Sequence, residues 1–310
     1  IYLKIIQIKL LIIIKYNTRA LLQTCLRSVF DQTKKLDFEV IVVDNGSSDG
    51  SRDMLAQDFP QVRTIFNANN RGFAAANNQG IRIARGEQIL LLNSDTEILD
   101  RAIEKAVAFV DAQPQAGIVG CKLLNTDGSL QPSCRGFPSA WHLFSEAFFL
   151  YLLFGKTRLF GGYHMGYFAH DRTRQVDVVM GAFMLIRRQV FEQVGLFDES
   201  FFMYTEETDF CYRARQQGFR VFFTPDAQVL HHVAASKKSS RSYLEQVHFS
   251  QIQFMQKHFH GLQKQWCIFL KKLSIAIRVP VYFLLGSMKS NRDLKMKSRD
   301  YFAILTKSFR

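Results

Sequence analysis

Three short apolar runs, each followed by a polar cluster, constrain the fold of this chain more than any other feature of its sequence. The runs are LLIII at 10–14, EVIVV at 39–43 and QILLL at 88–92, and they alternate with helical patterns at 19–32, 50–58 and 73–85. Strands that alternate with helices form βαβ units, in which a mostly parallel sheet carries helices on its faces. The sequence therefore predicts an α/β fold.

The polar clusters lie where these predicted strands end. They are Tyr16-Asn17, the residues from Asp44 to Asp49, and Asn93-Ser94-Asp95. Ligands of such sheets bind outside the carboxyl ends of the strands. Asn93 and Asp95 share one side of an extended chain, and a carboxylate such as Asp95 can bind a hard divalent cation. The alternative is that Asp95 caps a helix, because the helix-like TEILDRAIEKAV follows it.

Asp44 ends the second run and precedes turn-forming residues in VVDNGSSDGS (42–51). A carboxylate at this place can accept the imide N–H of a uracil or thymine ring. A simple Asx turn would explain Asn45 to Asp49 but gives no reason for Asp44. No GxGxxG follows any predicted strand, which disfavours a dinucleotide-binding enzyme.

The remaining segments complete the predicted domain and add an extension. Residues 178–195 have the pattern of a strand that leads into a helix, 201–218 that of a helix ended by Gly218, and 221–225 that of a strand. The apolar stretch 141–160 is too short to span a bilayer, and charges and a proline interrupt the stretch 266–286, which suits an interfacial helix. We predict an α/β domain at 1–235 and a helical extension at 236–310.

Positive charge is concentrated in that extension. Residues 1–235 contain 25 Lys and Arg against 24 Asp and Glu, whereas residues 236–310 contain 15 against 3, so the net charges are +1 and +12. An anionic membrane surface and a nucleic acid are the two candidate partners. Trp266, Phe269 and Tyr282 fit a membrane equally well, and we expect a membrane and no nucleic acid as the partner.

The cysteines and the opening residues indicate the compartment. Five cysteines are widely spaced without a CxxC pair, which favours a reducing cytosol over a disulfide framework or a zinc site. The opening IYLKIIQIKLLIII lacks the small-residue cleavage site of a signal peptide, and we interpret its second half as the first buried strand. We therefore expect a cytoplasmic protein that is peripheral on the inner face of the cell membrane.

Seven blocks, taken in order, resemble the bacterial family 2 glycosyltransferases, and the rhamnosyltransferase-like members in particular. The resemblance covers roughly residues 9–236. The blocks are KYN (15–17), VVDNGSSDGS (42–51), NNRGFAAANNQG (69–80), LLLNSDT (90–96), GAFMLIRR (181–188), FDESFFMYTEETDFCYR (197–213) and HHVAAS (231–236).

The resemblance implies a GT-A fold, a nucleotide-sugar donor, a divalent cation and inversion at the anomeric carbon. NSD stands where the family has its DxD motif, so Asp95 inherits the contact with metal and diphosphate, while Asn93 replaces the first acid. His231 aligns with the family's metal-binding or phosphate-contacting histidine; without the alignment, a structural role is the expectation for either His231 or His232. A carboxylate with an imidazole would accept Mn²⁺ more readily than Mg²⁺.

The donor pocket and the catalytic base follow from the same resemblance. The predicted donor-binding residues are Tyr16, Asn17, Asp44, Asn70, Arg71, Gly72, Asn78, Asn93 and Asp95. Glu207 stands where the family has its usual base, Glu206 beside it is the rival, and Asp209 would orient neighbouring groups or the acceptor. The alternative is a solvated acidic helix start, which the helix dipole favours.

The predicted function is thus that of an inverting glycosyltransferase in bacterial surface glycan synthesis. Its partners would be a dTDP- or UDP-sugar, with rhamnose as one candidate sugar, and a lipid-linked or polysaccharide acceptor. The alternative is a catalytically inactive scaffold of the same fold that binds a nucleotide sugar or a glycan. Only the enzyme would release nucleotide diphosphate.

Overall fold

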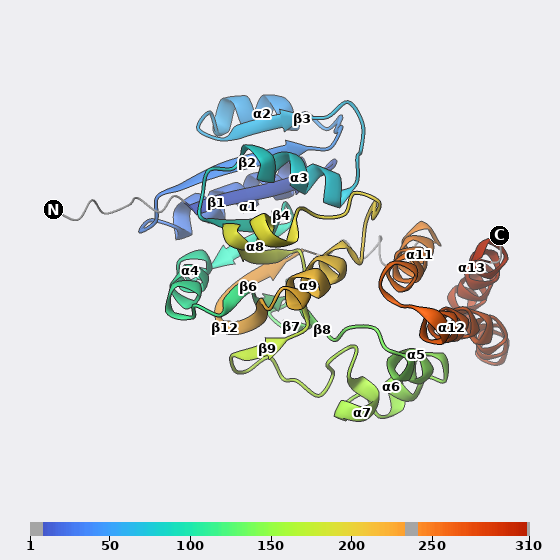
Figure 1. The fold of residues 1–310 in the computed structure, drawn as a ribbon. Helices are drawn as coiled ribbons and strands as arrows, with labels where there is room; N and C mark the ends of the chain where they lie inside the picture. The colour runs from blue at the N-terminus through green and yellow to red at the C-terminus, as the bar shows by residue number, and fades with distance from the viewer. Residues whose placement is uncertain (1–8, 233–240, 309–310) are drawn as a thin grey trace. The chain divides into compact units, whose positions relative to one another are not determined.

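The computed structural model describes residues 9–232 and 241–308, which form two compact units (Figure 1). The first unit takes 9–135, Ala169–Phe202 and 206–232, and the second takes Gly136–Phe168, Met203–Thr205 and 241–308. This division differs from the boundary expected at 235, because residues 136–168 pack with the C-terminal helices. The first part of the opening stretch, the end of the 231–236 block and the start of the 236–310 extension lie outside the described residues.

One large sheet forms the centre of the first unit. Its strands lie in the order β3-β2-β1-β4-β11-β6-β12-β5, with β7 paired to β6 and β9 paired to β12. The bounds are β1 Lys9–Lys15, β2 Phe38–Asp44, β3 Arg63–Phe66, β4 Gln88–Asn93, β5 Thr96–Leu99, β6 Ala116–Leu124, β7 Leu130–Gln131, β9 Arg174–Val176, β11 Phe183–Arg187 and β12 Arg220–His231. A second, two-stranded sheet pairs β8 (Cys134–Arg135) with β10 (Val178–Val179).

The sheet is parallel where the sequence predicts βαβ units. β1 pairs in parallel with β2 and with β4, β2 with β3, and β6 with β12, while β11 runs antiparallel between β4 and β6. Helices pack on its faces: α1 (Arg19–Gln32), α2 (Ser51–Asp58), α3 (Phe73–Ile83), α4 (Ala102–Ala112), α8 (Arg188–Val194) and α9 (Glu206–Gln216). The predicted fold class, a mostly parallel α/β sheet flanked by helices with further helices at the C-terminal end, is confirmed.

The helix expected over 201–218 begins later than its pattern suggests. Tyr204 and Thr205 have φ angles of 65° and 72°, in the left-handed region that a right-handed helix excludes. The helix α9 therefore starts at Glu206, the first of the acids with a predicted catalytic role.

The second unit consists of helices. They are α5 (Ala140–Ala147), α6 (Leu150–Leu153), α7 (Arg158–Gly161), α11 (Arg241–His258), α12 (Gly261–Met288) and α13 (Arg292–Ser308). The long helix α12 packs against both α13 and α5 (Figure 1). Among the helices of the described residues, none combines the length and the hydropathy that crossing a membrane requires.

A buried ion cluster joins α5 to α12. Lys271 Nζ lies 3.2 Å from Glu146 Oε1, and Arg278 Nη2 lies 3.9 Å from the same oxygen. Burial alone would raise the pKa of Glu146, but the charges of Lys271 and Arg278 outweigh burial and hold this pKa at about 2. The carboxylate is thus ionised wherever the unit is folded near neutral pH.

Glu146→Gln is expected to destabilise the protein by about 3 kcal/mol at neutral pH, because it leaves Lys271 buried without a counter-charge. The difference in unfolding free energy between variant and wild type should shrink as pH falls from about 4.3 towards about 2. The reason is that the Glu146 carboxylate of the wild type protonates in the unfolded state first. Urea unfolding curves at several pH values measure this.

Glu245→Gln is a matched control, because Glu245 also pairs with a lysine of the same unit, at 3.0 Å from Lys307. Lys307 is exposed, so this change should cost less than about 1 kcal/mol. Equal losses of unfolding free energy in the two variants would show that the burial of Lys271 does not increase the contribution of its ion pair to stability.

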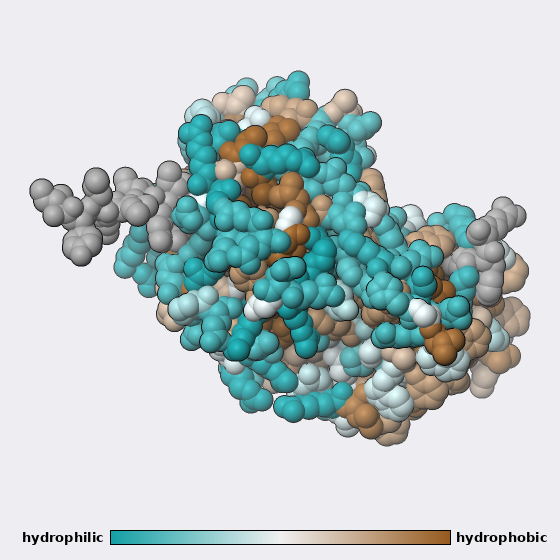
Figure 2. Space-filling view, viewed as in Figure 1, coloured by the Kyte–Doolittle hydropathy of each residue, from teal (hydrophilic) through white to brown (hydrophobic). Residues whose placement is uncertain are grey.

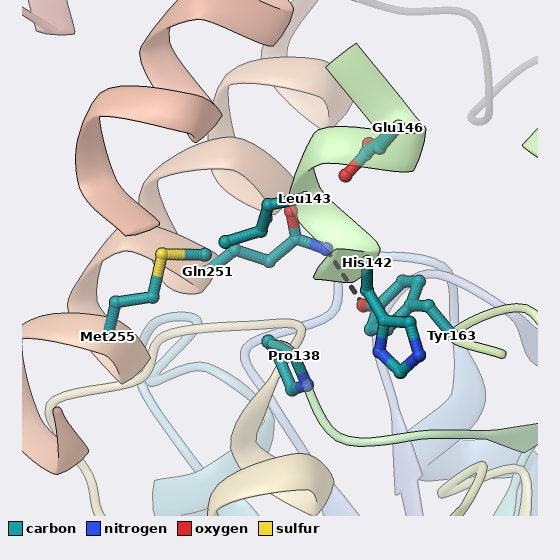
Figure 3. A pocket seen from close by; sticks show the side chains of 7 residues that line it. All are labelled: Pro138, His142, Leu143, Glu146, Tyr163, Gln251 and Met255. Atoms are coloured by element: carbon teal, nitrogen blue, oxygen red, sulfur yellow. Dashed lines mark hydrogen bonds between the residues drawn. The ribbon is translucent and has the colours of Figure 1, made fainter. Parts of the chain in front are cut away.

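A small cavity lies between α5 and α11 (Figure 3). Its volume of about 10 Å³ has room for about one water molecule, not for a sugar. Gln251 lines it and donates to Tyr163 Oη at 2.9 Å. We assign the cavity to packing, and none of its lining residues is a predicted site residue.

Candidate active site at the carboxyl edge of the sheet

The polar ends of β1, β2 and β4 meet at one edge of the sheet, because these strands are parallel neighbours. Asn17 N–H donates to Ser47 Oγ at 2.9 Å, and Ser48 N–H donates to Asn17 Oδ1 at 3.0 Å. Thr18 and Ser94 join their hydroxyls at 2.9 Å. The structure thus brings together the three clusters that follow the predicted strands, and Tyr16 and Asn17 remain exposed beside them.

Asp44 lies at this edge but is buried and internally bonded. Its Oδ1 accepts the N–H of Ser47 at 2.8 Å, and its Oδ2 lies 3.5 Å from Lys15 Nζ. The ammonium of Lys15 is also buried; it lies 2.9 Å from Asp49 Oδ1 and donates to Ser51 Oγ. The turn therefore does give Asp44 a structural role, in addition to the predicted contact with a nucleobase.

The loop that contains Asn70, Arg71 and Gly72 is tied to the same edge through Asn45. Asn45 Nδ2 donates to Asn70 Oδ1 at 2.8 Å, and Asn45 Oδ1 accepts the N–H of Arg71 at 3.1 Å. Gly72 has a φ of +83°, and a Cβ there would lie 2.4 Å from the carbonyl oxygen of Phe202. Only glycine fits this approach. The side chain of Arg71 is exposed and can reach a ligand.

Asn78 is placed differently from the other predicted donor residues. Its Nδ2 donates to Phe197 O and to Glu199 Oε1, both at 2.9 Å, and its Oδ1 accepts the N–H of Phe197 at 3.0 Å. The side chain is buried on α3, and these bonds use both its donors. The structure thus gives Asn78 a role in holding residues 197–199 rather than an open face for a donor.

Asp95 and His231 meet through the pairing of β5 with β12. β5 begins directly after Asp95 and runs antiparallel to β12, so that Thr96 pairs with His231. His231 Nε2 consequently lies 3.3 Å from Asp95 Oδ1. The alternative of a helix N-cap is wrong, because Thr96–Leu99 forms a strand and α4 begins only at Ala102, with Arg101 as its N-cap residue.

The surroundings of His231 fit a cation. His231 Nδ1 lies 2.6 Å from Gln131 Oε1, a carbonyl that only accepts, so Nδ1 carries the proton. In the neutral form of the ring, Nε2 then presents a lone pair, with the Nδ2 of Asn93 at 3.4 Å as a weak donor. A lone pair and a carboxylate oxygen that face each other at 3.3 Å are complementary to a divalent cation.

Two protein ligands do not complete a metal site. Within 9–232 and 241–308, no cluster of three or more His, Cys, Asp or Glu could hold a metal ion. The side chain of His232 is engaged elsewhere, 2.5 Å from Glu97 Oε1. A cation held by Asp95 and His231 would need further ligands from outside the described residues, such as water or anionic oxygens.

The three acids at the start of α9 have different environments. Glu206 is buried, and its Oε2 has no hydrogen-bond partner among the described residues. Glu207 is half-buried and accepts the N–H of Gly181 at 3.1 Å through Oε1. Asp209 is buried and lies 2.8 Å from Arg213 Nε, which makes it a structural ion pair within the helix. A solvated acidic helix start is therefore the wrong description.

Both glutamates have raised pKa values. Burial raises the pKa of Glu206 well above its usual range, and the carboxylate of Glu207 adds to this effect. Burial also raises the pKa of Glu207, while the Gly181 N–H and the positive charge of Arg135 oppose the rise. A carboxylate with a raised pKa is a better proton acceptor once ionised, so Glu207 combines partial access with basicity.

Two hydrogen bonds link Glu207 to the sheet edge that holds Asp95. Gly181 donates to Glu207, and the carbonyl of the next residue, Ala182, accepts the N–H of Asn93 at 3.1 Å. A Cβ at Gly181 would lie 3.0 Å from Glu207 Oε1, so a larger residue here would press on this carboxylate. The start of α9 and the end of β4 are therefore linked through two consecutive residues, Gly181 and Ala182.

Four residues of this site were not predicted from the sequence: Lys15, Gln131, Arg135 and Gly181. Lys15 gives a signal, since a lysine that ends an apolar run needs a buried counter-charge. Gly181 opens a block with family resemblance, which is a second signal. Gln131 and Arg135 lie on two-residue strands whose position no local pattern indicates.

The comparisons with known proteins concern the family and the fold. The family model described as "Glycosyl transferase family 2" matches residues 10–195. The chain is 28% identical over 279 residues to N-acetylglucosaminyl-diphospho-decaprenol L-rhamnosyltransferase of Mycobacterium tuberculosis, which covers 83% of this chain and 87% of that protein. It is 27% identical over 214 residues to dTDP-rhamnosyl transferase RfbF of Shigella flexneri, covering 66% of this chain and 64% of the relative.

A solved structure shows the same fold. The mannosyltransferase PcManGT from Pyrobaculum calidifontis, in complex with GDP-Man and Mn²⁺, superposes with a TM-score of 0.59 at 18% identity. The superposition covers 98% of this chain and 87% of that chain. At this identity the likeness concerns the GT-A fold alone.

Proposed function

The chain belongs to glycosyl transferase family 2, and from that premise we propose that it is an inverting, rhamnosyltransferase-like enzyme of bacterial surface glycan synthesis. The proposed donor is a dTDP- or UDP-sugar, and the proposed acceptor is a lipid-linked glycan. The names of two relatives, a decaprenol-diphosphate L-rhamnosyltransferase and a dTDP-rhamnosyl transferase, support both choices.

One observation carries the proposal: the Asp95–His231 pair lies at the same sheet edge as the half-buried Glu207. The Asp95–His231 pair suits a cation that carries a diphosphate, and Glu207 suits the role of proton acceptor. Asn93 connects them, because it contacts His231 through its side chain and Ala182 through its backbone N–H. A glycosyl transfer requires both functions within one substrate's reach.

The proposed reaction is a direct displacement at the anomeric carbon. The acceptor hydroxyl oxygen forms the new glycosidic bond, its proton passes to the Glu207 carboxylate, and the bond from the sugar to the diphosphate breaks with inversion. A divalent cation bound by Asp95 and His231 would neutralise the charge of the departing nucleotide diphosphate. Asp44 and the loop at 70–72 would hold the nucleoside.

A donor screen tests this proposal. Purified full-length protein is incubated with dTDP-rhamnose and a panel of UDP-sugars, with and without a lipid-linked acceptor, and released nucleotide diphosphate is measured. We expect release that needs the acceptor and that a chelator stops. Tight donor binding without any release would support the inactive scaffold instead.

Asp44→Asn is expected to raise the KM for the donor roughly tenfold or more while lowering kcat less, because hydrogen bonds to charged groups contribute about 1.5–3 kcal/mol. The imide N–H of the base would lose its charged acceptor, while the turn keeps an oxygen for Ser47. Competition by dTDP or UDP against donor turnover measures the effect.

Asp49→Asn is the matched control, since Asp49 also pairs with Lys15 but is not assigned to the base. Pyrophosphate, which has no base, should compete equally with all three proteins. If both substitutions weaken the binding of dTDP and UDP to the same degree, Asp44 acts only through the loop. Its predicted contact with the nucleobase is then wrong.

Membrane association is the second part of the proposed function. The +12 charge of residues 236–310 supports it, together with the exposed side chains of Trp266 and Phe269 on α12. Charge and interfacial aromatic residues together bind anionic membranes more firmly than either does alone. The proposed location is the inner face of the cell membrane, where a lipid-linked acceptor would be within reach.

A further inference from the structure

Exposed apolar side chains are concentrated in the second unit. Among the residues of the first unit whose exposure the structure describes, three large hydrophobic residues are exposed, namely Tyr16, Ile83 and Phe202. The second unit exposes many more: Trp141, Phe148, Leu152, Leu153, Phe154, Leu159, Leu262, Trp266, Phe269, Phe283, Leu284, Leu285, Met288, Met296 and Phe302. Figure 2 shows such side chains gathered over α6, α7 and α12. Contiguous apolar surface of this kind marks an interaction site.

Part of this surface comes from the middle of the chain. We call residues 141–159 the apolar hairpin; it comprises most of α5, all of α6 and the start of α7. At its tip Leu152, Leu153 and Phe154 follow one another, with Leu153 exposed to 73%. Three consecutive exposed apolar residues are costly in water, so they indicate a partner that is apolar as well.

The apolar hairpin is held firmly on α12. The buried Lys271 pairs with Glu146 at 3.2 Å, and Arg278 Nη2 donates to the Glu146 carbonyl at the same distance. The guanidinium carbon of Arg278 also lies 4.9 Å from the centre of the Phe149 ring. The hairpin and α12 therefore present their apolar side chains from one connected support.

The charge around these side chains identifies the partner. Lys156 and Arg158 are exposed beside the tip of the hairpin, and Lys289, Arg292 and Lys295 are exposed where α12 passes into α13. A second copy of the chain would bring like charges together. A bilayer surface with anionic headgroups instead offers apolar acyl chains and negative charge at once.

We propose that the apolar hairpin inserts into the interface of an anionic lipid bilayer, next to α12, and forms a second anchor within the family domain itself. The proposal extends the membrane association of residues 236–310 to a segment inside the region that matches the family model. The two anchors would share the ion cluster of Glu146, Lys271 and Arg278 as their common support.

The test compares full-length variants by co-sedimentation with vesicles. The triple variant Leu152→Gln/Leu153→Gln/Phe154→Gln should bind vesicles of phosphatidylcholine and phosphatidylglycerol at least about tenfold more weakly than the wild type. Each of the three substitutions removes apolar surface that would be buried in the bilayer. Ile83→Gln, which removes an exposed apolar residue of the first unit, should bind like the wild type. Unchanged binding of the triple variant would overturn the proposal.

Tryptophan fluorescence gives a second readout that needs no change at the tip. The chain has two tryptophans, so Trp266→Phe leaves Trp141 of the hairpin as the only one. Its emission should shift to the blue with anionic vesicles and be quenched by brominated lipid. An unchanged emission spectrum would overturn the proposal. So would dimerisation of the wild type in solution, if the triple variant no longer dimerises.

These measurements are independent of turnover. The triple variant should release nucleotide diphosphate normally with a water-soluble acceptor analogue, because the hairpin contributes no residue to the proposed active site. Vesicle binding without turnover would contradict the proposed function, and turnover without hairpin insertion would contradict this inference alone.

Discussion

Asp95→Ala is expected to lower metal-dependent turnover by about 10³-fold or more while the protein stays folded. Among the described residues, the carboxylate and His231 are the two groups assigned to the proposed cation, and His231 alone offers a neutral ligand. Asp95 is partly exposed, and its backbone carbonyl still accepts the N–H of His232, so the turn survives the substitution. Steady-state rates across a range of Mn²⁺ and Mg²⁺ concentrations measure the loss.

A matched variant separates this role from the general loss of a negative charge. Glu97→Gln removes a carboxylate that also faces a histidine, His232, just beyond the site. It should turn over at close to the wild-type rate. Binding of Mn²⁺ in the presence of UDP, followed by electron paramagnetic resonance, should disappear only in Asp95→Ala. Normal metal-dependent rates in folded Asp95→Ala would place the diphosphate site elsewhere.

The Asp95–His231 pair illustrates how much of the proposed site the sequence could predict. The apolar run that ends in Asn93 predicts a sheet edge, and the alternation of residues places Asp95 on the same side. Sequence patterns could not decide between a helix cap and a ligand, because the next residues are compatible with both. The helix cap is excluded by β12, more than a hundred residues later, because it pairs with 96–99 as a strand; the ligand role of Asp95 stays a prediction. Such non-local pairing overrides local propensity.

The same limit applies to the fold. β1, β2 and β4 are buried parallel strands whose continuous apolar runs are readable without a partner. By contrast, β8 and β10 are two residues long and exist only because they pair with each other. The grouping of 136–168 with the C-terminal helices depends on ion pairs between Glu146 and residues of α12, which no spacing rule predicts.

The sequence also predicts only part of the environment of the catalytic base. Resemblance indicates the EETD segment, but Glu206 and Glu207 are adjacent and differ by about 100° around a helix, so only one can readily face an acceptor. Gly181 settles the environment of Glu207 by donating its N–H and by leaving space for the carboxylate. That glycine is distant in the sequence, and its role is visible only in three dimensions.

Glu206→Gln should remain active, and it is the control for the base. Its Oε2 is buried and has no hydrogen-bond partner among the described residues, so the substitution removes no hydrogen bond of that atom. The pKa of Glu206 is raised in the folded state, so the wild type loses stability as pH rises from the unfolded pKa towards the folded one. Glu206→Gln lacks this ionisation and should have a flatter dependence of unfolding free energy on pH over that range.

Glu207→Gln should lower kcat by roughly 10²- to 10⁴-fold with donor affinity nearly unchanged, because it removes a general base and nothing else. The amide oxygen of glutamine can still accept the N–H of Gly181, so the helix start keeps its position. In the wild type, kcat/KM should fall in acid through a pKa above that of an ordinary glutamate, since burial raises the pKa of Glu207. The residual activity of the variant should lack this acid limb. If Glu206→Gln is inactive and Glu207→Gln active, the base is one residue earlier; if both are active, catalysis by a carboxylate of α9 is excluded.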